Sequence, residues 1–320
     1  MANEEQWINS FYQENCGCTL EDICGQHFWK QIMKGCICEK EVDDLFDIRP
    51  SWGFLLCGEA GAGKSTLAQA FLGELEKAGY RVIYLRAADL LTEEDKSLSR
   101  AAQLQRSCMQ EKAAVFLDDA EDLCDRIPVA EKLAEGFSVL KNHQRPVVWI
   151  LAAADEEDIP SVLRKQLLLC QIGLPDRRER EEYFEAMLGE FTDGTGRCSA
   201  GNMAEITEEF NYEQLNRIVD FARNLLKQKA LDQYHTIDKI QEAVEEGLLS
   251  IKREQFSLIV EKVRKKEIAK PMEMISGKIV MPAVAPSQPD METVEGISTG
   301  SDPISLDDEL EMLDADNFKY

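Results

Sequence analysis

Apolar residues along the chain follow two alternating patterns. Short apolar runs occur in GFLLCG, RVIYLRA, AAVFLDD and PVVWILAAA, which begin at residues 53, 81, 113 and 146. Between these runs, TLAQAFLGELEKAGY, which closes at Gly79, and the stretch at about 93–111 carry apolar residues at helical spacing. Buried strands that alternate with helices are typical of a parallel sheet covered on both faces. The pattern therefore predicts an α/β fold with a doubly wound parallel sheet.

The loop after the first apolar run carries the most specific motif of the chain. It contains G-x-x-x-x-G-K-[ST] as Gly58, Gly63, Lys64 and Ser65. Glycines let successive backbone N–H groups converge on phosphate oxygens, and the helix that follows directs its positive end at the same anion. The motif predicts a nucleoside triphosphate site whose contacting residues are Gly58, Glu59, Ala60, Gly61, Ala62, Gly63, Lys64, Ser65 and Thr66.

Individual roles follow from the chemistry of this loop. Lys64 is expected to reach the β- and γ-phosphates and to face solvent when no nucleotide is bound, and Ser65 is expected to ligate Mg²⁺. The strand AAVFLDD ends in Asp118 and Asp119. Because ligands of open parallel sheets bind at the carboxyl ends of the strands, both carboxylates are expected beside the loop. Asp118 is expected to hold Mg²⁺ through water.

Composition limits the class of partner and the compartment. With 320 residues, the chain is long enough for one α/β domain and a smaller companion, or for two modest domains. Its formal charge of -24 argues against a nucleic-acid groove, which needs clustered Lys and Arg, although an acidic protein is also simply soluble. No apolar stretch is long enough to span a bilayer, and the start MANEEQW is unlike a secretory leader. Ten cysteines without an export signal indicate a cytoplasmic protein.

The cysteines near the start of the chain leave two interpretations open. Cys16 and Cys18 form one C-x-C pair and Cys36 and Cys38 another, with Cys24 and His27 between them. Four thiolates suffice for a structural zinc site. Zinc knuckles more often use C-x-x-C spacing, and the segment around Cys36 also fits a helix with buried free thiols.

The end of the chain differs in composition from the rest. From Pro271 to Tyr320 it holds five of the ten prolines and eleven acidic residues against two lysines. Such a composition predicts a disordered acidic tail over 269–320. Leu306, Leu310 and Leu313 recur at helical spacing among acids, which predicts a docking helix near 304–318 for a basic partner. A solvated tail that only aids solubility is the alternative.

The motifs in this order resemble the AAA ATPase family. The resemblance lies in TLEDICG, GEAGAGKST, VFLDDAEDL, ILAAADEEDIPSVLRK, GLPDRREREEYFEAML, ITEEFNYEQLNRIVDFARNLL and IKREQFSLIVEKV, over about residues 19–265. It implies a P-loop NTPase domain over 19–178, after an extension over 1–18, and an α-helical lid over 179–268. It also implies ATP and Mg²⁺ as cofactors, Ile23 and Gly25 flanking the adenine, and a homo-oligomeric, hexameric ring with each ATP between neighbouring subunits.

Three positions depart from the family pattern. Asp119 stands where the family usually has a Glu that orients the attacking water, which predicts slow turnover or none. Asp155 follows Ala154 at the sensor position, where it either helps to position the water or caps the next segment. The arginine finger falls near Arg164 and Lys165, and Arg164 is the candidate, with a surface arginine as the alternative.

Substrate handling is less clear from the sequence. The stretch DLLTEEDKSL, where threading members carry an aromatic pore residue, offers only Leu90 or Leu91 as a weaker grip. The sequence as a whole predicts an ATPase that remodels or assembles a protein partner. A nucleotide-gated adaptor with little hydrolysis and a helicase-loader-like ATPase, which KAGYRVIYLRAADLL resembles, remain as alternatives.

Overall fold

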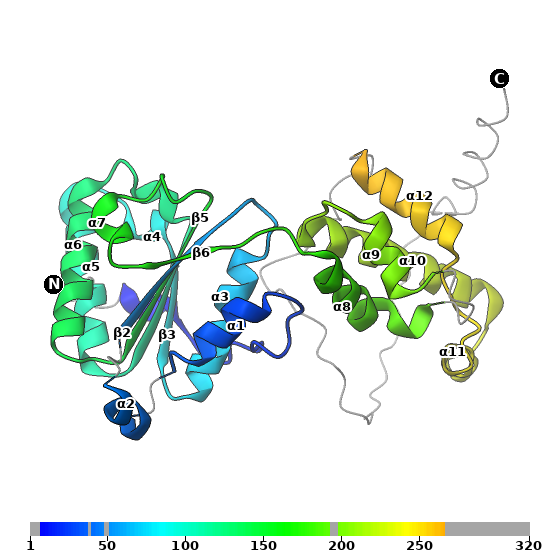
Figure 1. The fold of residues 1–320 in the computed structure, drawn as a ribbon, viewed down its shortest axis with the longest axis horizontal. Helices are drawn as coiled ribbons and strands as arrows, with labels where there is room; N and C mark the ends of the chain where they lie inside the picture. Colours follow the sequence, from blue (N-terminus) through cyan, green and yellow to red (C-terminus); the bar gives the residue numbers. More distant parts are fainter. Residues whose placement is uncertain (1–6, 38–39, 48–50, 193–197, 266–320) are drawn as a thin grey trace.

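The computed structural model describes residues 7–37, 40–47, 51–192 and 198–265, which form an α/β part and a helical part (Figure 1). The α/β part contains, in chain order, η1 (Ile8–Phe11), β1 (Tyr12–Gln13), α1 (His27–Lys34), α2 (Lys40–Phe46), β2 (Ser51–Cys57), α3 (Lys64–Lys77), β3 (Arg81–Arg86), α4 (Ala87–Leu90), α5 (Glu94–Gln110), β4 (Ala113–Asp118), η2 (Ala120–Leu123), α6 (Ile127–Asn142), β5 (Val147–Ala153), α7 (Ser161–Arg164) and β6 (Leu168–Gln171).

The six strands form one sheet in the order β1-β3-β4-β5-β2-β6. All neighbours are parallel except β1, which pairs antiparallel with β3. In this order β2 lies between β5 and β6. After β2 the chain forms β3, β4 and β5 on one side of β2, and it then crosses to the other side of β2 to form β6. The predicted doubly wound α/β fold is confirmed.

The two faces of the sheet are covered by different helices. Along β4, Val115 and Leu117 belong to the core that includes Leu104 of α5 and Phe137 of α6. Phe116, which lies between them, belongs to the opposite core, beneath α1 and α3. Successive side chains of a strand point to opposite faces, and both faces here are buried, which explains the continuous apolar runs in the sequence. Figure 1 shows α5 and α6 on one side of the strands and α3 on the other.

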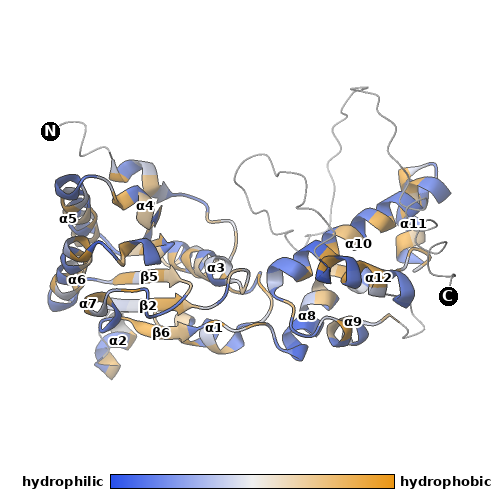
Figure 2. Cartoon of the chain, turned by 90° about the horizontal axis from the view of Figure 1, so that it is seen from above, coloured by the Kyte–Doolittle hydropathy of each residue, from blue (hydrophilic) through white to orange (hydrophobic). Residues whose placement is uncertain are grey.

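The helical part follows β6 and has its own apolar core. It contains α8 (Arg177–Leu188), η3 (Gly189–Phe191), α9 (Ala200–Ile206), α10 (Tyr212–Gln233), α11 (Ile237–Glu245) and α12 (Arg253–Arg264). Phe184 of α8 and Phe256 of α12 are fully buried and meet edge to face, with ring centroids 5.5 Å apart. Figure 2 shows α8, α10 and α12 with mixed hydrophilic and hydrophobic faces, as expected for helices packed around a small core. The division into domains at residues 178 and 268 stays a prediction.

The beginning of the described chain is part of the sheet. Tyr12 of β1 lies opposite Ile83 of β3, and the guanidinium carbon of Arg81 lies 3.4 Å from the centre of the Tyr12 ring. Trp7 and Phe11 pack against the core beneath α5 and α6. The sequence predicted only a short extension over 1–18, because a strand of two residues gives no periodicity to detect.

Other predictions concern the surface and the chain end. Leu90 ends α4 with its side chain fully buried in the core, so the prediction that it grips a substrate is wrong; Leu91 is half-buried. The tail over 269–320 and the predicted helix over 304–318 lie outside the described residues. Within the described part of the chain, no helix is both long and apolar enough to cross a membrane.

Candidate functional site

The loop between β2 and α3 has the backbone geometry of an anion-binding turn. Gly58 approaches the residue after β6 so closely that a Cβ atom at this position would lie 2.1 Å from the carbonyl oxygen of Ile172. Gly63 has φ +95° and precedes the first residue of α3, a conformation that favours glycine. The loop therefore ends at a helix N-terminus, whose free N–H groups attract anions.

Lys64 folds back over the loop. Its Nζ donates to the carbonyl oxygens of Gly58, at 2.7 Å, and of Glu59, at 3.1 Å. Lys64 is thus half-buried where the sequence predicted a solvent-facing side chain, because two backbone acceptors hold the ammonium group against the loop. The same contacts keep the positive charge beside the expected phosphate position.

Ser65 and Asp118 meet at the carboxyl edge of the sheet. Ser65 Oγ donates to the Asp118 carboxylate, at 3.1 Å from Oδ2 and 3.3 Å from Oδ1. Tyr84, two residues before the end of β3, places its hydroxyl 3.4 Å from Oδ2. Burial raises the pKa of Asp118, and the nearby charge of Asp119 adds to this effect. A partly desolvated carboxylate beside a hydroxyl is a donor set of hard oxygens, which fits Mg²⁺.

Asp119 has an uncommon backbone conformation. Its φ is +52° and it caps the 3-10 helix η2, with its own N–H donating to Asp118 Oδ1 at 3.2 Å. Asp tolerates this left-handed region better than most residues. Arg86, the last residue of β3, lies close enough that hydrogen bonding to Tyr84 and the charge of Asp119 raise its pKa.

Asp155 and Arg164 contact local backbone groups. Asp155 is exposed, and its Oδ1 accepts the backbone N–H of Glu157 at 3.0 Å in the turn that follows β5. Its role in positioning the water stays a prediction. Arg164 ends α7 half-buried, with Nη1 donating to the carbonyl oxygen of Glu156 at 3.3 Å. Its role toward a neighbouring subunit stays a prediction.

The cysteines at the start of the chain lie in different surroundings. Cys36 is buried, and its thiol donates to the carbonyl oxygen of Ile32 at 3.2 Å. Burial raises the pKa of Cys16 to about 12 and that of Cys36 to about 12. Among the residues that the structure describes, which exclude Cys38, no three His, Cys, Asp or Glu side chains gather as metal ligands.

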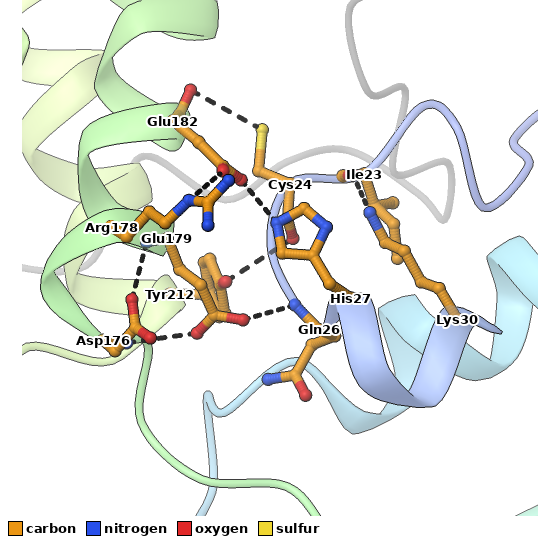
Figure 3. Close-up of polar contacts among 10 residues, drawn as sticks. All are labelled: Ile23, Cys24, Gln26, His27, Lys30, Asp176, Arg178, Glu179, Glu182 and Tyr212. Atoms are coloured by element: carbon orange, nitrogen blue, oxygen red, sulfur yellow. Dashed lines mark hydrogen bonds and ion pairs between the residues drawn. The ribbon is translucent and has the colours of Figure 1, made fainter. Parts of the chain in front are cut away.

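The segment around Ile23 and Gly25 joins the helical part. Both residues are buried, and the Gly25 backbone, with φ +70°, lies against Tyr212 and Glu179. Figure 3 shows the neighbouring residues Ile23, Cys24 and Gln26 facing these side chains. One Glu179 oxygen accepts the backbone N–H of Gln26 and the other that of Asp176.

A further contact crosses this junction at Glu182. The His27 ring nitrogen Nε2 lies 2.7 Å from Glu182 Oε2, and Arg178 Nε donates to Glu182 Oε1 at 3.2 Å. Figure 3 shows these side chains converging from α1 and α8. The contact of His27 with Glu182 therefore links the start of α1 to α8 of the helical part.

The first turn of α10 lines the same pocket as the phosphate loop. The pocket is bounded by Gly61, Gly63, Lys64, Ser65, Thr66, Tyr212, Glu213 and Asn216. Just before α10, Asn211 Nδ2 donates to the carbonyl oxygen of Ala60 at 3.1 Å. Sequence reasoning missed this wall, as it missed Tyr84 and Arg86. Asn211 is a typical helix cap, so the sequence could have predicted where α10 begins. That this helix start lies beside the phosphate loop follows only from the tertiary fold.

Comparison with known proteins agrees with this geometry. Residues 54–174 match the family described as AAA, ATPase family associated with various cellular activities. Cell division control protein 48 homolog C of Arabidopsis thaliana is 27% identical over 161 residues, or 46% of this chain and 19% of that protein. Nuclear valosin-containing protein-like of Mus musculus is 30% identical over 143 residues, or 40% of this chain and 16% of that protein. The matched region thus spans less than a fifth of the length of these relatives.

A solved structure extends the likeness to the helical part. The structure titled Structural Basis for Katanin Self-Assembly has a TM-score of 0.55 and 18% sequence identity, and covers 82% of this chain and 91% of that one. At this identity the likeness concerns the fold. The family match over residues 54–174, which hold the sheet and its phosphate loop, identifies this part of the chain as an AAA domain.

Proposed function

We propose that this protein binds ATP with Mg²⁺ and hydrolyses it to remodel or assemble a protein partner. The observation that carries the proposal is the junction of Lys64, Ser65 and Asp118: Lys64 and Ser65 line one pocket at the N-terminus of α3, and the Ser65 hydroxyl contacts the Asp118 carboxylate. These groups match the charges of a triphosphate and its metal ion.

Each group has a distinct task in this proposal. Loop N–H groups and Lys64 bind the β- and γ-phosphates, and Ser65 with Asp118 holds Mg²⁺. Bound Mg²⁺ would neutralise charge on the phosphate oxygens. Ile23 and Gly25 flank the adenine, and Asp119 orients the attacking water. Because the Asp119 side chain is one methylene shorter than Glu, we expect slow turnover.

Assembly and location belong to the same proposal. Arg164 of one subunit completes the site of its neighbour in a homo-oligomeric, hexameric ring, as arginine fingers do in other phosphoryl-transfer enzymes. The protein acts in the cytoplasm, on a protein rather than on nucleic acid or a membrane. The acidic C-terminal tail binds the partner.

A second candidate is a nucleotide-gated adaptor that binds ATP and hardly hydrolyses it. It is favoured by Asp155, whose Oδ1 accepts the backbone N–H of Glu157 in the turn after β5. Release of phosphate from ATP by the full chain, with and without Mg²⁺, separates the two. Mg²⁺-dependent turnover supports the ATPase, whereas tight binding without turnover supports the adaptor.

A further inference from the structure

Tyr212 lies between the phosphate loop and the segment that carries Ile23 and Gly25. Its hydroxyl donates to the carbonyl oxygen of Cys24 at 3.5 Å (Figure 3). A Cβ atom on Gly25 would lie 2.2 Å from this hydroxyl, and one on Gly63 would lie 3.4 Å from ring atom Cδ2. The phenol ring therefore closes the side of the pocket that leads from the loop to residues 23–25.

Contacts on α10 hold the ring in this place. Asn211 caps the helix by accepting the backbone N–H of Gln214 at 2.9 Å, and it also donates to the carbonyl oxygen of Ala60. The Tyr212 ring meets Tyr183 edge to face, with centroids 5.9 Å apart. Tyr212 is thus positioned by the helix start, by a neighbouring ring and by its own hydrogen bond.

The chemistry of the hydroxyl resembles that of a nucleotide base. It is a hydrogen-bond donor at the edge of a flat ring, directed at a backbone carbonyl group. The exocyclic amino group of adenine is also a donor at the edge of a flat ring. Glu179 cannot play this role, because its carboxylate accepts hydrogen bonds, here from the backbone N–H groups of Gln26 and Asp176, and does not donate to a carbonyl oxygen.

We propose that Tyr212 occupies the position of the adenine base, so that the base of a bound nucleotide displaces the phenol ring to reach the Cys24 carbonyl. The inference rests on the proposed function, since it assumes that phosphates bind on the loop and that the base extends toward residues 23–25. Tyr212 then lowers the affinity for the base-bearing part of the ligand and leaves the phosphate contacts unchanged.

Two variants of the full chain test this with two probes. ADP carries a base, and inorganic tripolyphosphate carries only phosphates. Tyr212→Phe keeps the ring but removes the bond to Cys24, so ADP affinity should rise about 2- to 10-fold, the range that one hydrogen bond gives. Tyr212→Ala vacates the position and should raise ADP affinity further. Tripolyphosphate should bind wild type and both variants equally in calorimetry.

A matched control lies at the other end of the same helix. Tyr234 caps the C-terminus of α10 and packs in a separate small cluster with Ile240 and Val244. Tyr234→Phe should leave both affinities unchanged. If Tyr212→Ala does not fold, as judged by circular dichroism, Tyr212→Phe still decides the question.

The outcomes distinguish this inference from the proposed function. Weaker ADP binding in the Tyr212 variants, with tripolyphosphate unaffected, would overturn the inference, because the ring would then be a wall on which the base stacks. Unchanged ADP binding would overturn it as well. If neither probe binds even the wild-type chain, the proposed function fails and the inference fails with it.

Discussion

Ser65 Oγ lies 3.1 Å from Oδ2 and 3.3 Å from Oδ1 of Asp118, so the first turn of α3 is joined to the end of β4. The two residues are 53 positions apart in sequence and meet because β4 is separated from β2 only by β5 in the parallel sheet. Parallel strands present their carboxyl ends on one edge, which brings the loop after β2 to the end of β4.

Asp118→Asn should abolish the Mg²⁺ dependence of nucleotide binding and leave the fold intact. The amide oxygen still accepts the Ser65 hydroxyl, but the negative charge that attracts the cation is gone. The measurement is the shift in melting temperature on adding ATP, with Mg²⁺ or with a chelator. An equal Mg²⁺-dependent shift in wild type and variant would exclude Asp118 from the metal site.

Asp119→Asn should lower ATP turnover by about 10²-fold or more while nucleotide affinity changes little, as expected on losing a general base. Asn suits the left-handed φ of this position, so the backbone is preserved. Asp122→Asn, an exposed residue in the same 3-10 helix, is the matched control. Equal phosphate release by wild type and Asp119→Asn would remove this residue from catalysis.

Mixing Arg164→Ala subunits with Asp119→Asn subunits should restore part of the activity that each variant lacks. Some interfaces of a mixed ring then combine an intact Asp119 with an intact Arg164, and a trans arginine is worth about 10³- to 10⁵-fold in rate. Lys165→Ala, the exposed neighbour, should retain activity by itself. Mixtures that co-assemble in sedimentation but stay inactive would argue against a trans finger at Arg164.

Glu76 of α3 binds the backbone near the start of the chain. Replacing its carboxylate should change how the free energy of unfolding depends on pH. Its carboxylate accepts the backbone N–H groups of Asn15 and Cys16, at 2.7 and 2.8 Å. These bonds, that from Cys16 foremost, hold the pKa of Glu76 below its ordinary value of 4.5. A lowered pKa in the folded state stabilises the fold above pH 4.5, and this contribution is lost as the pH falls through the folded-state pKa.

Glu76→Gln should therefore lower the free energy of unfolding by about 1 kcal/mol or less at pH 7, because the site is largely solvated. The difference from wild type should shrink at low pH. Urea unfolding at several pH values measures it, and Glu74→Gln on the same helix is the control. A difference that stays constant with pH would contradict the assigned role of the charge.

The sequence alone predicts the strands and helices that bury an apolar face, and the residues of the phosphate loop. The apolar run of β5 predicts a buried strand, and the spacing of apolar residues in α3 predicts a helix. The motif from Gly58 to Ser65 predicts a phosphate-binding loop. These predictions depend only on residues close together in the chain, so a single sequence is enough to make them.

The remaining features depend on contacts between distant segments. Tyr212 contacts Cys24, which lies 188 positions away in the sequence, and no periodicity of the sequence predicts such a contact. Leu90 lies in a short stretch beside acidic residues, and only the packed core shows that it is buried. The left-handed φ of Asp119 arises from the turn between β4 and η2, which the pattern of apolar residues does not define.

The most direct test of the central claim is the affinity of the full chain for ATP in calorimetry, wild type against Lys64→Ala. Lys64 supplies the positive charge of the loop, and a charge-assisted contact to phosphate is among the strongest polar contacts in proteins. Lys77→Ala, at the exposed end of the same helix, is the control. The account predicts that ATP binds wild type and Lys77→Ala alike and that Lys64→Ala, with an unchanged circular dichroism spectrum, shows no binding. Equal ATP affinity for wild type and Lys64→Ala would contradict it.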